Sequence, residues 1–281
     1  MALKIAVFPH SKKEESTHLA KGIQEYLTTR GATVIAEDHV AKSIGATPLS
    51  EVDEKKIDFL LSMGGDGTIL GLIHRYAHLK AAIIGINLGH LGFMADIPLA
   101  EIYPSLQDLI SGAYTIDERI TLQGELPNGD TDFAVNDLVI HRGKIGSLVE
   151  LAIHVDGTYL NTFVADGVII STPNGSTAYS LAAGGPILTP SLQAIVLTPI
   201  SPHTISNRPI VLDASQKIEI QYLSDYDPLD LSADGISHFP LHTGDTLKIE
   251  KGKKTFRLVN LERHDYFATL RTKLAWAGKL R

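Results

Sequence analysis

Residues 57–76 read IDFLLSMGGDGTILGLIHRY, and this stretch predicts a strand, a glycine turn and a helix in succession. Residues 57–63 form an apolar run of strand length, and apolar residues then recur at helical spacing, at positions 69, 70, 72, 73 and 76. The turn, Gly64-Gly65-Asp66-Gly67-Thr68, offers backbone N–H groups at the positive end of a helix dipole, which favours phosphate binding. Glycine lets these groups approach a ligand without interference from Cβ.

Asp66 is the informative residue of this turn. A carboxylate beside a phosphate repels it unless the carboxylate binds a metal ion or acts as a base on an incoming hydroxyl. The alternative is that Asp66 only caps the following helix, and the residues alone leave both interpretations open. No other nucleotide motif competes, because the chain contains neither G-x-x-x-x-G-K-[ST] nor G-x-G-x-x-G.

The segments on either side of this unit repeat its alternation of strand and helix. Strands are predicted at residues 3–8, 33–37, 57–63 and 81–87, with helices at 17–30 and 68–78. Strands that alternate with helices indicate a mainly parallel sheet with helices on its faces.

After about residue 112 the pattern becomes β-rich, with runs at residues 120–126, 131–142, 148–155, 158–163, 194–199, 217–223, 246–250 and 255–261. The dipeptides Asn128-Gly129 and Asp156-Gly157 predict hairpins, because these residues accept the positive φ of a tight turn. Helical stretches are expected near 176–183 and 266–274. We therefore predict an α/β domain of residues 1–115 with 265–281, and a β-rich domain of residues 116–264.

Composition excludes several classes of protein. The 281 residues include 25 Lys and Arg against 32 Asp and Glu, a formal charge of −7, which argues against a nucleic-acid-binding protein. The absence of cysteine excludes disulfides, thiol catalysis and cysteine-bound zinc. No apolar run approaches the roughly 20 residues of a membrane span, and the start reads as a first strand rather than a signal peptide, so we expect a cytoplasmic protein. His74 and His78 have metal-ligand spacing without an H-E-x-x-H pattern, and no resident metal site is predicted.

A second polar segment, TPNGSTAYS at residues 172–180, is followed by Ala183-Gly184-Gly185-Pro186. It could be an ordinary surface helix with Ser176 or Thr177 as its cap and the glycines as its end. The crowding of small polar residues and glycine turns is also typical of a site that needs close backbone approach and hydroxyl donors.

Asn136-Asp137 interrupts the apolar run FAVNDLVI at residues 133–140. A buried carboxylate without a partner costs several kcal/mol, so Asp137 needs one, and sugar hydroxyls or a main-chain N–H would both serve. Asp166 poses the same question, although Asp166-Gly167 also reads as a plain turn or bulge.

Taken together, GGDGT at residues 64–68, NGSTAYS at 174–180 and AGGP at 183–186 resemble the NAD kinase family, in its bacterial, ATP- or polyphosphate-dependent form. GINLGHLGF at residues 85–93, Asn136-Asp137, Asp166-Gly167 and LTPI at 197–200 fall in the family's order, from about residue 3 to 276. GGDGT alone is shared with diacylglycerol and sphingosine kinases, so NGSTAYS is the specific element. The resemblance implies a Rossmann-like N-terminal domain, a β-sandwich-like C-terminal domain and a C-terminal helix that returns to the first domain.

The resemblance also implies an activity: transfer of phosphate from ATP with Mg²⁺ to the adenosine-ribose 2′-hydroxyl of NAD, with polyphosphate left open as a donor. Asp66 would be the general base, and the phosphate loop would comprise Gly64, Gly65, Gly67 and Thr68. The implied NAD-binding set is Asp66, Gly67, Asn136, Asp137, Asp166, Thr177, Ala178, Tyr179, Ser180, Leu181, Ala182 and Ser201. A homodimer or homotetramer would be expected.

Three positions depart from the family pattern. Asp137 stands where the family commonly has Glu, and Ala182 where a serine is usual. Near residue 234 relatives place a polar contact residue, a role that Ile236 cannot fill and Asp234 could. Two other functions are weighed against an NAD kinase: a diacylglycerol-type lipid kinase, which shares GGDGT, and a non-catalytic dinucleotide-binding regulator, which would not need Asp66.

Overall fold

The computed structural model describes residues 2–11, 13–204 and 206–276; the last residues of the predicted first domain, 277–281, lie outside the described residues. The chain divides into two compact units, Met1–Asp117 with Arg257–Arg281 and Glu118–Phe256. The first is α/β and the second is built almost entirely of strands, so the predicted fold class is confirmed.

The first unit is organised around a seven-stranded sheet with the strand order β3-β2-β1-β4-β5-β19-β6. The strands are β1 (Lys4–Phe8), β2 (Thr33–Ala36), β3 (Thr47–Pro48), β4 (Phe59–Met63), β5 (Ala82–Ile86), β6 (Tyr114–Arg119) and β19 (Phe256–Leu261). Pairing from β3 through β19 is parallel. Every residue of β4 and β5 is buried, as continuous apolar runs in a doubly covered sheet should be.

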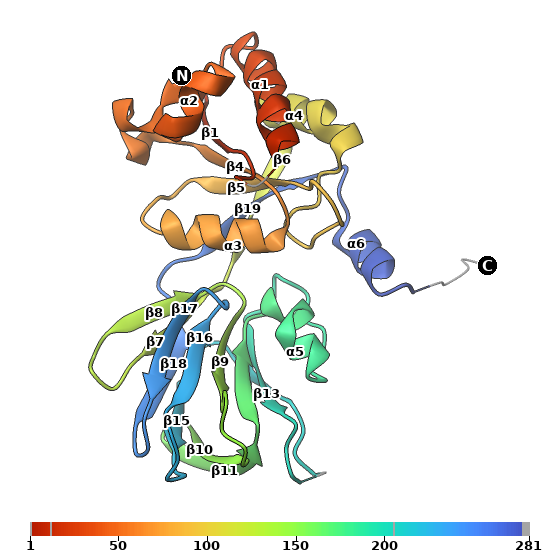
Figure 1. The fold of residues 1–281 in the computed structure, drawn as a ribbon. Helices are drawn as coiled ribbons and strands as arrows, with labels where there is room; N and C mark the ends of the chain where they lie inside the picture. Colours follow the sequence, from red (N-terminus) through yellow and green to blue (C-terminus); the bar gives the residue numbers. More distant parts are fainter. Residues whose placement is uncertain (1, 12, 205, 277–281) are drawn as a thin grey trace, which may run out of the picture. The chain divides into compact units, whose positions relative to one another are not determined.

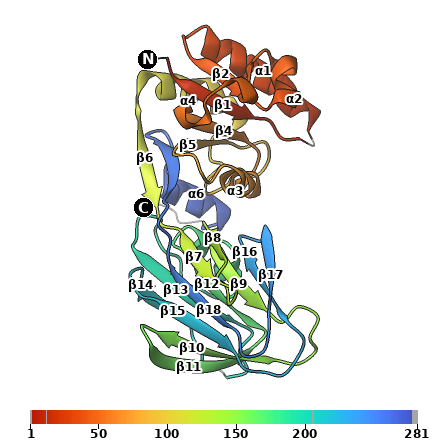
Figure 2. The same ribbon diagram turned by 90° about the vertical axis from the view of Figure 1, so that its left-hand side faces the viewer.

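Helices lie on both faces of this sheet. Figures 1 and 2 show α1 (Glu14–Thr28), α2 (Asp38–Ile44) and α4 (Ile102–Ser111) on one face and α3 (Asp66–Arg75) on the other. Short 3₁₀ turns lie at Leu49–Glu51, Glu54–Lys56 and Leu99–Glu101, and α6 (Tyr266–Lys273) follows β19. Both predicted helices begin earlier than expected, at residues 14 and 66 rather than 17 and 68; the first turn of α3 forms because the Gly65 carbonyl accepts from Thr68 and Ile69 N–H.

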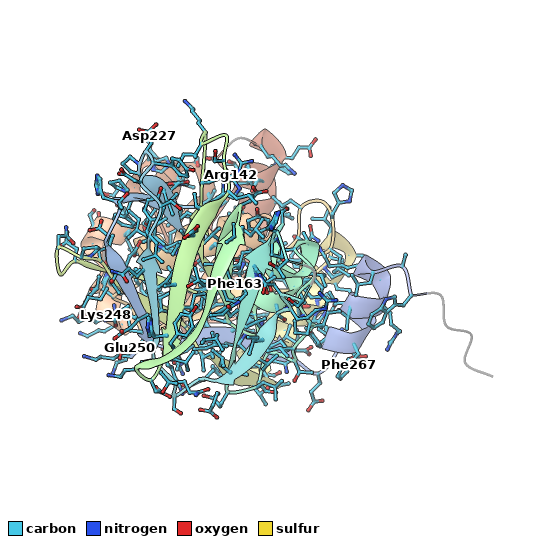
Figure 3. All side chains as sticks on the ribbon, turned by 90° about the horizontal axis from the view of Figure 1, so that it is seen from below. Arg142, Phe163, Asp227, Lys248, Glu250 and Phe267 are labelled. Atoms are coloured by element: carbon cyan, nitrogen blue, oxygen red, sulfur yellow. The ribbon has the colours of Figure 1, made fainter. Side chains whose placement is uncertain are left out.

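The second unit consists of two six-stranded sheets, ordered β11-β10-β15-β18-β7-β8 and β14-β13-β12-β9-β16-β17. The strands are β7 (Leu122–Glu125), β8 (Thr131–Ala134), β9 (Asp137–His141), β10 (Val149–Val155), β11 (Thr158–Ala165), β12 (Gly167–Ser171), β13 (Ala194–Ile200), β14 (Ile210–Asp213), β15 (Ile218–Tyr222), β16 (Leu229–Ala233), β17 (Ser237–Leu241) and β18 (Thr246–Lys251). One apolar core draws residues from both sheets, which makes the unit a β-sandwich. In Figure 3 Phe163 lies among the strands of this unit, whereas Lys248 and Glu250 lie at its margin.

Both predicted hairpins are confirmed. Gly129 has φ 86° between β7 and β8, and Asp156 and Gly157 have φ 49° and 75° between β10 and β11. The predicted strand 131–142 is wrong in one respect, because it breaks at residues 135–136 into β8 and β9. β19, which the predicted boundary assigned to the β-rich domain, instead pairs with β5 in the first sheet. No helix among the described residues is long and apolar enough to cross a membrane.

Candidate active site

The GGDGT turn lies at the carboxyl end of β4, and the loop 87–95 lies at the carboxyl end of the neighbouring strand β5. Carboxyl ends of parallel strands meet at one edge of a sheet, so the two segments come together. Asp66, the first residue of α3, accepts from three successive N–H groups of this loop: Phe93 to Oδ2 at 2.8 Å, and Met94 and Ala95 to Oδ1 at 3.0 and 2.9 Å. The Asp66 side chain is therefore fixed in orientation by the loop, and it is not the side-chain cap of its own helix.

Glycines make this approach possible. A Cβ on Gly92 would collide with the Asp66 carboxylate, and a Cβ on Gly64 would collide with the Thr68 hydroxyl. By contrast, a Cβ on Gly65 or Gly67 would point into open space, so that part of the turn is accessible to a ligand. Of the three predicted phosphate-loop glycines, Gly64 is therefore needed for packing, whereas Gly65 and Gly67 lie beside an open surface.

The C-terminal helix α6 contacts the same loop. Lys273 of α6 donates to the Leu91 carbonyl at 2.8 Å, and its Nζ lies 5.2 Å from the centre of the Phe93 ring. The rings of Tyr266 and Phe93 have centroids 6.0 Å apart. The predicted return of the C-terminal helix to the first domain is confirmed, and the helix contacts the loop that binds Asp66.

In the second unit, Val135 and Asn136 form the bend between β8 and β9, and Asp137 is the first residue of β9. Asp234 lies in the turn after β16 with φ 52°, and its carboxylate accepts from the N–H groups of Val135, Asn136 and Asp137 at 2.8, 2.7 and 3.1 Å. These bonds replace strand pairing and explain the break in the predicted strand. The Asp234 carboxylate, which the sequence offered as a polar contact residue, therefore contacts the backbone of its own chain.

The Asp137 carboxyl has no hydrogen-bond partner among the described residues, although the residue is only 6% exposed. The main-chain N–H groups that could have served it are taken by Asp234. Burial, and after it the charge of Asp234, raises the pKa of the Asp137 carboxyl to about 7. A buried polar group that the protein leaves unbonded needs a partner such as a water molecule, an ion or a ligand.

The polar segment 172–180 packs against this bend. Thr172 donates through Oγ1 to the Val135 carbonyl at 2.6 Å and through its N–H to the Asn136 carbonyl at 2.8 Å. Asn174 Nδ2 donates to Asn136 Oδ1 at 2.6 Å, and a Cβ on Gly175 would collide with the Asn136 backbone. Two motifs that are far apart in the sequence therefore form one site.

The segment is less regular than predicted. A 3₁₀ turn (Gly175–Thr177) and a single helical turn, α5 (Tyr179–Ala182), are separated by Ala178 at φ −102°, ψ −126°. The predicted cap is wrong, because Ser176 Oγ donates to the Pro173 carbonyl at 2.7 Å and Thr177 Oγ1 to the Asn174 carbonyl at 3.1 Å. The glycine end is confirmed by Gly184 at φ 89°.

The remaining predicted NAD-binding residues of the second unit differ in exposure. Ala178, Tyr179 and Ala182 are exposed, Thr177 and Leu181 are half-buried, and the fully buried Ser180 shares a 2.8 Å hydrogen bond with Thr198 Oγ1. Ser201 follows β13 with φ 45°. Asp166 lies between β11 and β12 and pairs with Arg142, with 2.5 Å between Oδ1 and Nε.

Comparison with known proteins identifies the family. Models of the ATP-NAD kinase N-terminal and C-terminal domains match residues 5–114 and 135–261. The NAD kinase of Protochlamydia amoebophila (strain UWE25) is 56% identical over 277 residues, 99% of each chain. This chain belongs to the ATP-NAD kinase family. The NAD kinase prediction is confirmed, and nothing supports the lipid kinase or the non-catalytic regulator.

Solved structures of NAD kinases share the fold. Yeast NADH kinase complexed with NADH superposes with a TM-score of 0.84 at 29% identity, covering 100% of this chain and 89% of that chain. An NAD kinase from Archaeoglobus fulgidus in complex with ATP gives 0.76 at 26% identity, covering 99% and 100%. ATP-dependent kinases of this kind generally use a divalent metal ion. No group of three or more His, Asp or Glu side chains in the described part of the chain could hold one.

Sequence patterns did not indicate several residues that contact the predicted site residues. The N–H donors at residues 93–95 carry no side-chain signal, although the position of their loop after a neighbouring strand could have indicated them. Arg142, the partner of Asp166, was not singled out. Nor was Arg119, which is 6% exposed and donates through Nη1 to Asn174 Oδ1 at 2.5 Å.

Proposed function

We propose that this chain transfers the γ-phosphoryl group of ATP to the 2′-hydroxyl of the adenosine ribose of NAD, giving NADP and ADP. The ribose oxygen forms a bond to the γ-phosphorus, the bond to the β-phosphate bridging oxygen breaks, and the hydroxyl proton passes to Asp66. The geometry of the Asp66 carboxylate is the observation that carries this proposal.

A carboxylate has two oxygens and about four acceptor positions. Among the described residues, Asp66 Oδ1 already accepts from Met94 and Ala95, and Oδ2 accepts from Phe93 alone. One acceptor position therefore remains, on Oδ2, and it can receive a single proton from an incoming hydroxyl. The three N–H groups hold the carboxylate in one orientation, so no entropy is lost in orienting it during the reaction.

Asn136 and Asp137 are proposed to bind hydroxyl and amide groups of the dinucleotide. The support is the pair of polar groups that the protein leaves unbonded there, the Asp137 carboxyl and the Asn136 amide nitrogen, neither of which has a partner within the described residues. The proposed set also includes Gly67, Asp166, Thr177, Ala178, Tyr179, Ser180, Leu181, Ala182 and Ser201, with Gly64, Gly65, Gly67 and Thr68 around the phosphates. Ser180 would fix its segment, since its hydroxyl is bonded to Thr198.

Mg²⁺ is the proposed metal ion. It usually binds through one or two carboxylates together with substrate phosphates, and it neutralises charge on the transferring group. Asp66 has one acceptor position left within the described residues, and that position cannot hold a metal ion while it receives the hydroxyl proton. We therefore propose that the ion is bound mainly by the phosphates of ATP and arrives with them. ATP is the proposed donor, with polyphosphate as a second one to be tested.

The experiment is an assay of NADP formation from NAD, ATP and Mg²⁺ together with the Asp66→Asn variant. Removal of a general base should lower kcat by ~10²–10⁴-fold. If Asp66 only anchors the loop, the variant should lose NAD affinity as well. Titration of NAD into the variant by calorimetry separates the two, because a base can be removed while binding is retained. Full activity of Asp66→Asn would refute the assignment of the base.

The division of roles between the units, the localisation and the oligomeric state are inferred from the family to which the chain belongs. We propose that the first unit handles the phosphates and the second binds NAD, that the protein is cytoplasmic, and that it forms a homodimer or homotetramer. Analytical ultracentrifugation tests the last point, and a panel with NAD, NADH, ATP and polyphosphate tests the range of substrates.

A further inference from the structure

Three buried side chains of the second unit form a continuous hydrogen-bonded row. Arg119 Nη1 donates to Asn174 Oδ1 at 2.5 Å, and Asn174 Nδ2 donates to Asn136 Oδ1 at 2.6 Å. Arg119, Asn174 and Asn136 are 6%, 6% and 9% exposed. The row therefore begins at a buried cation and ends at the bend that the proposed function assigns to the dinucleotide.

The chemistry of arginine fixes the direction of this row. A guanidinium group can only donate, so the atom of Asn174 that faces it must be the oxygen. The nitrogen of Asn174 is then turned towards Asn136, and the atom of Asn136 that meets it must again be an oxygen. Asn136 Nδ2 is left pointing away from the row, and it has no acceptor among the residues for which the structure gives positions.

We propose that Arg119 and Asn174 are positioning residues that set the Asn136 amide so that it offers N–H donors, and not its oxygen, to the dinucleotide. The proposal rests on the proposed function, which puts the ligand at this bend. The ligand group would be a hydrogen-bond acceptor beside a hydroxyl, because Asn136 offers a donor and the adjacent Asp137 an acceptor.

A purely structural role for Arg119 is the competing explanation. Its guanidinium lies 5.9 Å from the centre of the Phe256 ring, so it also contributes to packing. Packing alone, however, does not require a cation, whose burial is costly unless it is well paired. A charge-assisted bond is roughly twice as strong as a neutral one, which suits a group that has to hold an amide in one of two orientations.

The variant Asn174→Asp tests the direction without removing a link of the row. The new carboxylate still accepts from Arg119, but its second oxygen cannot donate. Asn136 must rotate its amide to donate to that oxygen, and it then presents Oδ1 to the ligand. We expect about 10- to 100-fold weaker NAD binding, as for an unpaired buried hydrogen-bonding group, with the KM for ATP unchanged.

The added charge of Asn174→Asp has its own controls. The new charge would be buried and paired with the Arg119 guanidinium, where salt screens it little, so its effect is separated from that of the amide by variants that leave residue 174 unchanged. In a second pair of variants, Arg119→Lys keeps a donor-only cation and should retain NAD affinity within a few-fold, whereas Arg119→Gln can face Asn174 with either atom and should weaken it. Thermal unfolding of both variants separates loss of packing from loss of orientation.

The amide itself can be observed by ¹H–¹⁵N NMR of the side-chain NH₂ groups, with no ligand present. One proton of the Asn136 NH₂ should shift downfield in Asn174→Asp, because it becomes hydrogen-bonded to the new carboxylate. An unchanged Asn136 spectrum, or unchanged NAD affinity in Asn174→Asp, would overturn the proposal. An unmodified protein that makes no NADP would instead refute the proposed function, and the NMR result would still decide the orientation.

Discussion

Replacement of Asp137 by asparagine should stabilise the ligand-free protein while it weakens NAD binding. Asp137 is 6% exposed and its carboxyl is unbonded within the described ranges, so no hydrogen bond offsets the cost of burying the ionised form. Asparagine has nearly the same shape and carries no charge. The variant thus removes a cost to folding at the position where the ligand is proposed to bind.

The sign of the pH dependence follows from the direction of the pKa shift. Burial, with the charge of Asp234, raises the pKa of the Asp137 carboxyl from 3.8 to about 7. A raised folded-state pKa gives stability that is complete below the unfolded value and is lost as the pH rises through the folded value. Above about pH 7 the ionised Asp137 therefore lowers the free energy of unfolding by about 4 kcal/mol relative to a neutral residue.

Asp137→Asn does not titrate, so its advantage over the unmodified protein should grow by about 3 kcal/mol from about pH 5 to about pH 8 and then level off. Urea unfolding followed by circular dichroism across this range measures the difference. Near-UV and far-UV signals should both be recorded, because the two units of the chain can unfold in separate steps. NAD affinity, measured by calorimetry at about pH 8, should fall about tenfold, because the amide replaces an ionised acceptor.

The matched control is Asp227→Asn, which makes the same change of charge at an exposed position of the same unit (Figure 3). Its stability difference should stay within about 0.5 kcal/mol at every pH. The reasoning would be refuted by an Asp137→Asn advantage that is independent of pH, or by a variant less stable than the unmodified protein at about pH 8. Either result would mean that the carboxyl has a partner in the ligand-free protein.

Two further predictions concern the contacts of the site carboxylates. Gly92→Ala should lower kcat by about 10²-fold or more, because its Cβ would displace the Asp66 carboxylate. The control is Gly89→Ala, whose Cβ meets nothing within 4 Å, and it should change activity less than about threefold in the same assay. NAD affinity should rise with pH as Asp137 ionises, because an ionised carboxylate is the stronger acceptor. Asp234→Asn removes the charge that helps to raise the pKa of Asp137, so this rise should move to lower pH, and an unmoved profile would show that burial alone sets the pKa.

Much of the fold could be predicted from local pattern. The strand, turn and helix around GGDGT depend on neighbours within about 20 residues, and the hairpin at Asp156-Gly157 depends on two residues that accept positive φ. Placement of β19 could not be predicted, because a six-residue apolar strand carries no mark of the sheet it joins. Its parallel pairing with β5 is a property of the whole chain.

The details of the site depend on contacts between distant residues. The strand break at Val135 arises from a carboxylate 99 residues further along the chain, which no window of sequence could reveal. The capping prediction for Ser176 failed for a similar reason, since its hydroxyl is engaged by Pro173 and Leu188 instead. The sequence did identify Asp137 as a carboxylate that needs a partner, but not that the main-chain alternative is closed by Asp234.

Three carboxylates, one in the first unit and two in the second, show how an acidic chain can accommodate anionic ligands. Asp234 and Asp66 each accept from three successive backbone N–H groups, so much of their charge is answered within the protein. Asp137 receives no such donor within the described part of the chain, and its raised pKa of about 7 reduces its charge near neutral pH instead. Negative charge is thus reduced in two ways, by backbone N–H groups at Asp66 and Asp234 and by a raised pKa at Asp137. Asp234 holds its bend in place, and Asp66 keeps one acceptor position for the proposed substrate hydroxyl. Asp137, unpaired within the described residues, depends on a water molecule or a ligand to complete its hydrogen bonds.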